Sequence, residues 1–267
     1  MKKIILTILS MSAAIGCNAQ ELHDYAIKVG DFSKLKVSDN CNVIYTTNPD
    51  SLGYAYFRAE REFADAFIFS NSSGTLKIQV NTEDVGKKGL PTVHIASRFL
   101  TDIESSSTLK VSISSPAPCA IIKSTLIGNG TLIVEGVNSD KAEASLKTGN
   151  GTLTISGSCQ QAKLSMLGTG TLQADMLKAN EVSCRILGSG TIGCWPVEKL
   201  STSGIGSTKV YYKGNPVSVK KRGGGKLLRL ESADAELNDK DKAPLPSREA
   251  FGGTTEEKEA TTVVEED

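Results

Sequence analysis

The feature that most constrains this fold is a short glycine-containing sequence that recurs at a nearly constant interval. The clear copies are Gly128-Asn129-Gly130-Thr131-Leu132, Gly149-Asn150-Gly151-Thr152-Leu153, Gly168-Thr169-Gly170-Thr171-Leu172 and Gly188-Ser189-Gly190-Thr191-Ile192. We place weaker copies at residues 204–208 and 223–227, and a degenerate copy at residues 105–109. The spacing is about 20 residues, a period typical of solenoids, in which each repeat forms one supersecondary unit.

Each copy predicts a tight turn followed by a strand. Glycine adopts positive φ without strain, so Gly-x-Gly reverses the chain, and the Thr-Leu that follows begins an alternation of period two. A second alternating stretch leads into each turn. The predicted inward residues after the turns are Leu132, Val134, Leu153, Ile155, Leu172, Ala174, Ile192, Cys194 and Val210; those before the turns are Leu126, Ala144, Leu146, Leu164, Met166, Cys184 and Ile186.

These units predict an all-β, two-sheeted parallel β-helix with about 20 residues per coil and a Gly-x-Gly turn in each. No stretch between the turns has helical periodicity, which argues against a doubly wound α/β fold. An antiparallel sandwich tolerates similar alternation, but it does not require near-identical turns at constant spacing. Stacking does require them, because like residues must lie in register about 4.8 Å apart.

The first hundred residues after the leader are β-rich without a clean repeat, and we expect irregular β-rich coils there. Candidate strands are residues 35–37, 42–46, 67–69, 76–80, 92–96 and 109–113. Residues 58–66 are expected to form a short helical turn. Terminal units of a solenoid are expected to be atypical, because they cover its open edge.

The sequence resembles the putative auto-transporter adhesin, head GIN domain family of Bacteroidetes. The resemblance is carried by the Gly-x-Gly-Thr-Leu series, by the segment Gly74-Thr75-Leu76-Lys77-Ile78 and by an amino terminus typical of exported proteins. The resemblance covers roughly residues 30–230. It implies a two-sheeted β-helix and a role in adhesion. It brings no catalytic residues to carry over.

The amino-terminal residues predict export. Lys2 and Lys3 precede a short apolar run, as in a signal peptide, and the run is too short to span a bilayer. We favour cleavage after Ala19. The alternative is a lipoprotein site at Cys17, which would attach the chain to a membrane; we expect membrane association only in that case. The expected location is the periplasm, the outer-membrane surface or the extracellular space.

We therefore divide the chain into a signal peptide (1–19), a β-helical domain (20–230; irregular to 120, repeat coils from 121) and an acidic tail (231–267). The tail holds twelve acidic and four basic residues, a net charge of −8, and we expect it to be disordered. A contact of the tail with Lys220, Lys221, Arg222, Lys226 and Arg229 is an alternative. The modest basic excess of the remainder, without interleaved aromatics, does not indicate nucleic-acid binding.

The sequence favours a non-enzymatic protein without a cofactor or metal. The two histidines, His23 and His94, are not clustered, so neither a metal site nor a histidine-based triad is expected. Charges predicted on the strand faces are single and of mixed sign: Glu135, Lys147, Lys163, Asp175 and Arg185. Cys184 and Cys194 are expected to face each other as small core residues. Cys184 is expected to stack between Leu164 and Leu200, and Cys194 between Ala174 and Val210. A disulfide between Cys41 and Cys119 is left as an alternative.

Two surface features are candidates for ligand contact. One is the Gly-x-Gly ridge with Asn129, Asn150, Thr169 and Ser189, beside a threonine ladder; turn geometry alone also explains it. The other is Trp195 with Tyr211 and Tyr212, which cap the solenoid or stack on a sugar. The favoured function is an adhesin-like binding or scaffold module for a glycan or protein ligand. The alternatives are a glycan-binding module using these aromatics, and a degenerate polysaccharide-active β-helix enzyme. Ligand identity and oligomeric state stay undetermined.

Overall fold

The computed structural model describes residues 22–81 and 90–230. The predicted signal peptide, the lipidation alternative at Cys17 and the predicted acidic tail lie outside the described residues. Within them, no helix is long and apolar enough to cross a membrane.

The described residues form strands almost throughout, with one α-helical turn, α1 (Arg61–Asp65), and one 3-10 turn, η1 (Pro49–Ser51). The strands are β1 (His23–Lys28), β2 (Lys34–Val37), β3 (Val43–Thr46), β4 (Tyr54–Ala59), β5 (Phe67–Ser72), β6 (Thr75–Val80), β7 (Val93–Ala96), β8 (Asp102–Ser105), β9 (Lys110–Ser114), β10 (Cys119–Ile127), β11 (Thr131–Lys147), β12 (Thr152–Gly168), β13 (Thr171–Gly188), β14 (Thr191–Ile205), β15 (Lys209–Lys213), β16 (Ser218–Gly223) and β17 (Lys226–Leu230).

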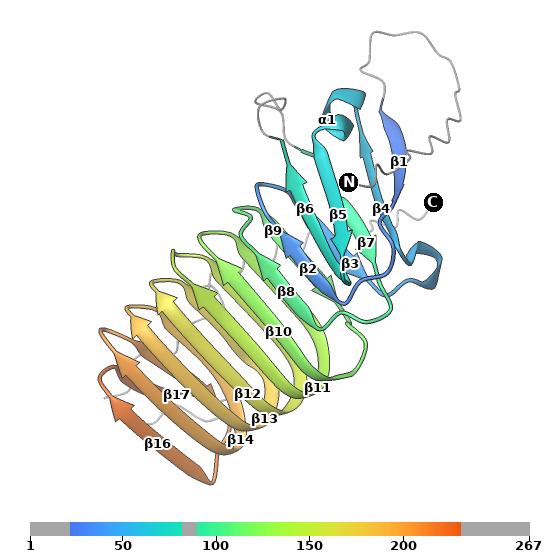
Figure 1. Ribbon diagram of the computed structural model, residues 1–267. Coiled ribbons are helices and arrows are strands. Elements are labelled where there is room, and N and C mark those ends of the chain that lie inside the picture. Colours follow the sequence, from blue (N-terminus) through green and yellow to red (C-terminus); the bar gives the residue numbers. More distant parts are fainter. Residues whose placement is uncertain (1–21, 82–89, 231–267) are drawn as a thin grey trace, which may run out of the picture.

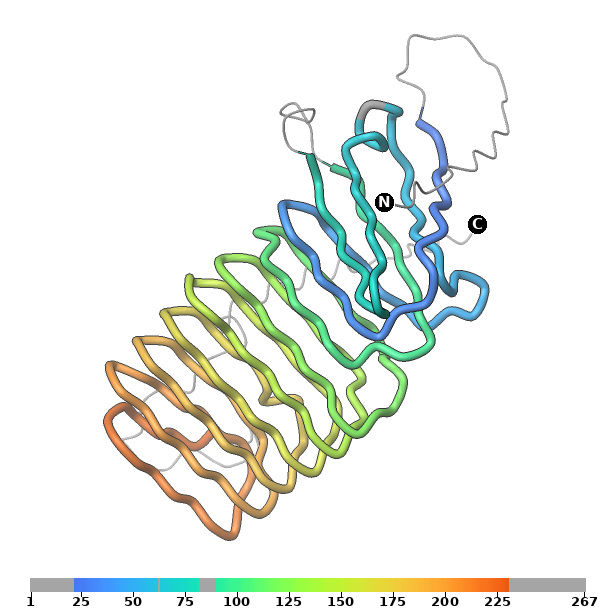
Figure 2. The backbone as a smooth tube through the Cα atoms, viewed as in Figure 1, coloured from blue at the N-terminus to red at the C-terminus, as the bar shows by residue number. Residues whose placement is uncertain are grey.

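These strands wind into stacked flattened coils, which confirms the predicted two-sheeted β-helix (Figures 1 and 2). From β8 and β9 onward, every pairing between coils is parallel. Strands β11 to β14 each run through both sheets, bending around one edge of the coil. Stacking in register satisfies the backbone donors and acceptors of each coil through its neighbours.

The first coils are not stacked in sequence order. Strand β2 lies between β6 and β8, and β3 lies between β7 and β9. After β1, the chain therefore forms the second coil with β2 and β3, then the first coil with β6 and β7, and then continues the stack with β8 and β9. Antiparallel strands β4 and β1 extend one sheet beyond β7, and β5 pairs with β6 in the other. This antiparallel cap covers the starting edge, as expected for an atypical terminal unit.

The predicted core positions are confirmed. All residues assigned to the inward face of the repeat coils are buried: Leu126, Leu132, Val134, Ala144, Leu146, Leu153, Ile155, Leu164, Met166, Leu172, Ala174, Cys184, Ile186, Ile192, Cys194 and Val210. All six candidate strands in the irregular region are strands, but β1, β4 and β8 were not predicted. The predicted helical turn is shorter than residues 58–66, because Arg58 and Ala59 continue β4, which pairs with β1.

The glycine turns bring the backbones of successive coils into direct contact. Gly168 has φ of 133° and Gly188 has φ of 134°, which other residues rarely adopt. The amide of Ser189 donates to the carbonyl of Gly168 at 3.1 Å, and the amide of Thr191 donates to that of Gly170 at 3.1 Å. A Cβ on Gly188 would overlap the carbonyl oxygen of Gly168. The sequence motif is therefore a requirement of the stacking itself.

The register corrects two predicted copies of the motif. Lys110, not Thr108, pairs with Thr131, so the degenerate turn lies two residues later than residues 105–109 imply. Lys209 pairs with Thr191, and Gly206 is the residue that stacks on Gly188. Both errors have one cause: the alignment followed glycine or serine spacing, whereas strand pairing sets the register.

We predict that Gly188→Ala lowers the free energy of unfolding by about 2–4 kcal/mol, through positive φ and backbone overlap. Urea unfolding followed by circular dichroism measures this change. The matched control is Ser189→Ala, whose side chain is exposed and whose effect should stay within about 0.5 kcal/mol. Equal stability of the two variants would contradict the proposed role of the turn.

Candidate functional site

The flattened coil has two long edges with different chemistry. The glycine edge carries the Gly-x-Gly turns, and the variable-turn edge carries the opposite bends, at residues 97–101, 115–118, 135–140, 156–160, 175–180, 195–198 and 214–217. Sequence varies freely from one bend to the next along the variable-turn edge. Variable loops placed by a rigid scaffold are where binding residues usually lie.

Polar groups at the glycine edge are used by the stack itself. The amide of Asn150 donates to Oδ1 of Asn129 at 2.8 Å, and Thr169 Oγ1 donates to the Gly149 carbonyl at 3.4 Å. The predicted threonine ladder is in register, with Thr152 paired to both Thr131 and Thr171. Stacking therefore uses part of the predicted ridge, including the amide of the exposed Ser189, which donates to the Gly168 carbonyl. Ligand contact by the ridge stays a prediction.

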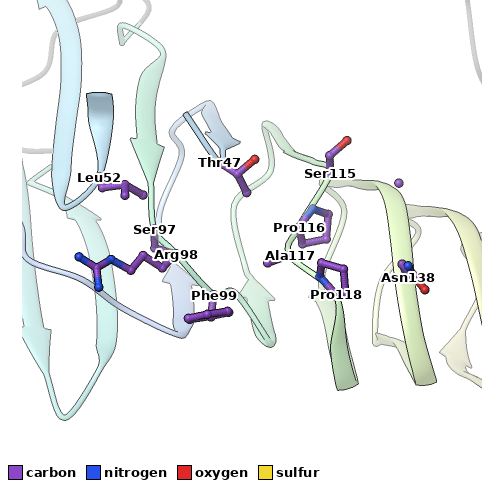
Figure 3. Close-up of a pocket in the computed structure, with 11 residues that line it drawn as sticks. Thr47, Leu52, Ser97, Arg98, Phe99, Ser115, Pro116, Ala117, Pro118 and Asn138 are labelled. Carbon is purple, nitrogen blue, oxygen red and sulfur yellow. The ribbon is translucent and has the colours of Figure 1, made fainter. Parts of the chain in front are cut away.

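The variable-turn edge holds a groove of about 610 Å³ where the first coils meet the cap (Figure 3). It is lined by Thr47, Leu52, Ser97, Arg98, Phe99, Ser115, Pro116, Ala117, Pro118, Gly136 and Asn138. These residues come from four bends that are neighbours in the stack, at residues 97–99, 47–52, 115–118 and 136–138, so the groove runs across coils. Its breadth suits a ligand lying on the surface, not one enclosed by the protein.

One wall is built by the bend after β7. Ser97 is buried, and its carbonyl accepts a hydrogen bond from the Tyr45 hydroxyl at 3.0 Å. The amide of Arg98 donates to Oδ1 of Asp31 at 3.2 Å. These bonds fix the bend, so that Phe99 projects into solvent with 60% of its surface exposed.

The opposite wall is built by the bend after β9. Pro116 and Pro118 each fix their own φ, and Ser115 takes a positive φ of 46°. Gly136, one coil further, lies close against this bend: a Cβ there would sit 2.9 Å from Ser115 Oγ. A rigid apolar wall therefore faces Phe99 across the groove (Figure 3).

The groove offers recognition chemistry without a catalytic constellation. It presents an aromatic ring, one guanidinium, and neutral oxygens and amides from Thr47, Ser115 and Asn138. Arg98 is 70% exposed and lies 4.0 Å from the Asp31 carboxylate, so this ion pair holds it only weakly. Across residues 22–81 and 90–230, no cluster of three histidine, cysteine or acidic side chains could bind a metal ion.

The structure places the predicted aromatic residues at the far end of the variable-turn edge. Nζ of Lys213 lies 4.4 Å from the centre of the Trp195 ring and that of Lys178 lies 5.9 Å away. Tyr212 packs against the core, over Cys194, whereas Tyr211 pairs with Gly193. Lysine contacts thus occupy the Trp195 ring, but ligand contact by these three residues stays a prediction.

The five described cysteines are free thiols, and the Cys41–Cys119 pairing left open by the sequence is not formed. Burial raises the pKa of Cys41 to about 12 and that of Cys159 to about 11. Contact with the Cys184 thiol, then burial, raises the pKa of Cys194 well above its usual value. Cys184 and Cys194 therefore face each other in the core as predicted. Their stacking neighbours, however, include Thr202 and Tyr212 instead of Leu200 and Val210, because of the two-residue register correction.

Sequence reasoning missed a charged column on the outer face of one sheet. Asp102, Lys123, Glu143 and Lys163 are paired in that order down the stack, with alternating sign. Glu143 also lies 2.6 Å from Nζ of Lys141, and this contact lowers the pKa of its carboxyl group. The sequence does carry one charged residue in each of these repeats, but only the strand register shows that these residues lie side by side. His94 is an exposed residue of β7.

Comparison with known proteins identifies the family. Residues 31–216 match the family described as putative auto-transporter adhesin, head GIN domain. The chain belongs to this family. The predicted resemblance is thereby confirmed. No functionally curated protein matches the sequence.

Solved structures share the fold. A putative adhesin from Bacteroides fragilis NCTC 9343 is 21% identical, with a TM-score of 0.71 over 79% of this chain and 98% of that chain. A putative lipid binding protein from Parabacteroides distasonis ATCC 8503 is 18% identical, with a TM-score of 0.61 over 79% and 97%. A putative adhesin from Parabacteroides merdae ATCC 43184 is 18% identical, with a TM-score of 0.55 over 79% and 97%. At these identities the likeness shows the fold alone.

Because burial keeps the reagent away from the other four thiols, we predict that iodoacetamide at pH 8 modifies Cys119 before the other described cysteines. Cys119 is the only one of the five described that is not buried. Peptide mass spectrometry after timed quenching measures each site separately. Labelling of Cys41 or Cys194 as fast as Cys119 would contradict the buried-thiol assignment.

Proposed function

We propose that this protein is an exported, non-enzymatic, adhesin-like module that binds a glycan at the variable-turn edge, in the groove beside Phe99. Membership of an adhesin family supports the general role. The observation that carries the finer proposal is the 60% exposure of Phe99 beside neutral hydrogen-bonding groups in this groove.

The chemistry of the groove suits a sugar. An exposed aromatic ring offers a flat apolar face to the C–H side of a pyranose, and an aromatic anchor near the centre of a site carries much of its binding energy. Arg98, Asn138 and Thr47 surround the ring with donors and acceptors for hydroxyl groups. The rigid bends on both walls limit the entropy lost on binding.

Lipid binding, suggested by the name of the Parabacteroides distasonis neighbour, is the less favoured function. An acyl chain needs a deep apolar cavity, whereas the groove lies open on the surface and the core between the sheets is filled with side chains. A catalytic role is also less favoured, because the residues around the groove provide no paired acid and base.

We predict that Phe99→Ala weakens glycan binding about tenfold, the loss expected for one aromatic stacking contact. The full chain is applied to a glycan array, and the Kd of the strongest glycan is then measured in solution. The matched control is Ile205→Ala, which removes a 72% exposed apolar side chain near the glycine edge. Unchanged binding by Phe99→Ala, or an equal loss in the control, would refute the assigned groove; binding to phospholipid vesicles but to no glycan would favour the lipid alternative.

A second substitution tests the alternative that the glycan binds at Trp195. Since lysines contact the Trp195 ring, we expect Trp195→Ala to leave glycan affinity within about twofold of the parent. The same array and titration measure it. A loss of binding in Trp195→Ala, with Phe99→Ala unaffected, would move the site to the last coils.

A further inference from the structure

Within residues 22–81 and 90–230, no strand covers the outer side of the last coil in either sheet. Among the described strands, β16 pairs only with β14 and β17 pairs only with β15. Each therefore presents a row of backbone donors and acceptors on its outer side. Such edges are templates for another strand, and proteins cover them or make them unattractive to neighbours.

This open edge is strongly basic, even at positions that face the core. Lys221 pairs with the buried Thr202, in the column of Leu164 and Cys184, and Arg229 pairs with Tyr212 above Cys194. Lys220 and Arg222 add two charges on the outer face of β16. Across the described part of the chain, no carboxylate forms an ion pair with any of these four side chains.

Apolar surface accompanies this charge. Val217 is 90% exposed and Val219 is 43% exposed, although Val219 stacks on the buried Leu200. A solvated terminal strand would not need an exposed valine at a core-facing position. The edge thus offers unpaired backbone groups, the exposed side chains of Val217 and Val219, and several cations to a segment that covers it.

The chain itself carries a segment with the complementary properties. Residues 261–267 read Thr-Thr-Val-Val-Glu-Glu-Asp: four β-branched residues, which favour strands, followed by three acids. The intervening residues 231–260 can span up to about 100 Å when extended, far more than the edge requires. The whole of residues 231–267 carries a net charge of −8.

We propose that residues 261–267 add a parallel strand to β16 and cap the open end of the solenoid in the same molecule. In the register that places valine on valine, Val263 lies on Val219. The same register places Glu265 on Lys221 and Glu266 on Arg222, so that opposite charges pair. This register continues the parallel pairing of the stack, covers the exposed valine and neutralises the core-facing lysine. A second copy docked edge to edge would instead bring like charges together.

The test uses hydrogen exchange of the full chain, read at the amides of β16. Glu265→Lys should speed their exchange by roughly tenfold or more, because loss of the added strand returns them to solvent. The double variant Lys221→Glu/Glu265→Lys should restore protection, since it re-forms the pair with reversed charges. The matched control is Glu256→Lys, which makes the same charge change outside the proposed strand and should leave exchange unchanged.

The outcomes separate the proposal from its competitors. Equal exchange in Glu265→Lys and the parent, or no rescue by the double variant, would overturn the pairing. An equal effect of Glu256→Lys would reduce it to a general charge effect and overturn the register. Size-exclusion chromatography with light scattering distinguishes pairing within one molecule from pairing between two molecules. A monomer is expected, and a dimer that is lost in Glu265→Lys would place the segment on the edge of a second molecule.

Discussion

Successive backbones touch at the glycine edge, and the rest of the structure depends on that approach. At Gly168 and Gly188 the chain reverses with positive φ, and the carbonyl of one turn lies where a side chain of the next would start. Only glycine satisfies both conditions. The turn fixes where each coil begins, and this places Leu132, Leu153, Leu172 and Ile192 in one buried column. The repeat therefore specifies the register as well as the fold class.

The same constraint gives the two edges of the coil different structural requirements. At the glycine edge, stacked amides and Asn or Thr side chains bond to the neighbouring coil, which leaves little for a ligand. The opposite bends carry no such requirement and can vary in length and sequence. The groove beside Phe99 lies there, held by the Ser97–Tyr45 and Arg98–Asp31 hydrogen bonds.

The sequence was informative where the period was strict and misleading where it was not. The inward residues of the regular coils, such as Leu153 and Met166, followed from alternation and are buried. The out-of-order first coils could not be predicted, because β2 lies between two strands that come later in the chain. The groove was missed for a related reason. Phe99 and Pro116 lie in bends without a repeat, and only the stacking brings them together. Trp195 was a candidate for stacking on a sugar, yet Lys178 and Lys213, from the coils on either side, contact its ring.

The central claim is that the variable-turn edge, and not the glycine edge, is the binding face. Hydroxyl-radical footprinting with and without the strongest array glycan tests it in the unmodified chain, because exposed reactive side chains report on both edges. Phe99 reports on the groove, whereas Leu167, 49% exposed, and Ile205, 72% exposed, lie near the glycine edge. The account predicts that the glycan protects Phe99 from oxidation and leaves Leu167 and Ile205 unchanged. Protection of Leu167 and Ile205 with Phe99 still fully oxidised would contradict it.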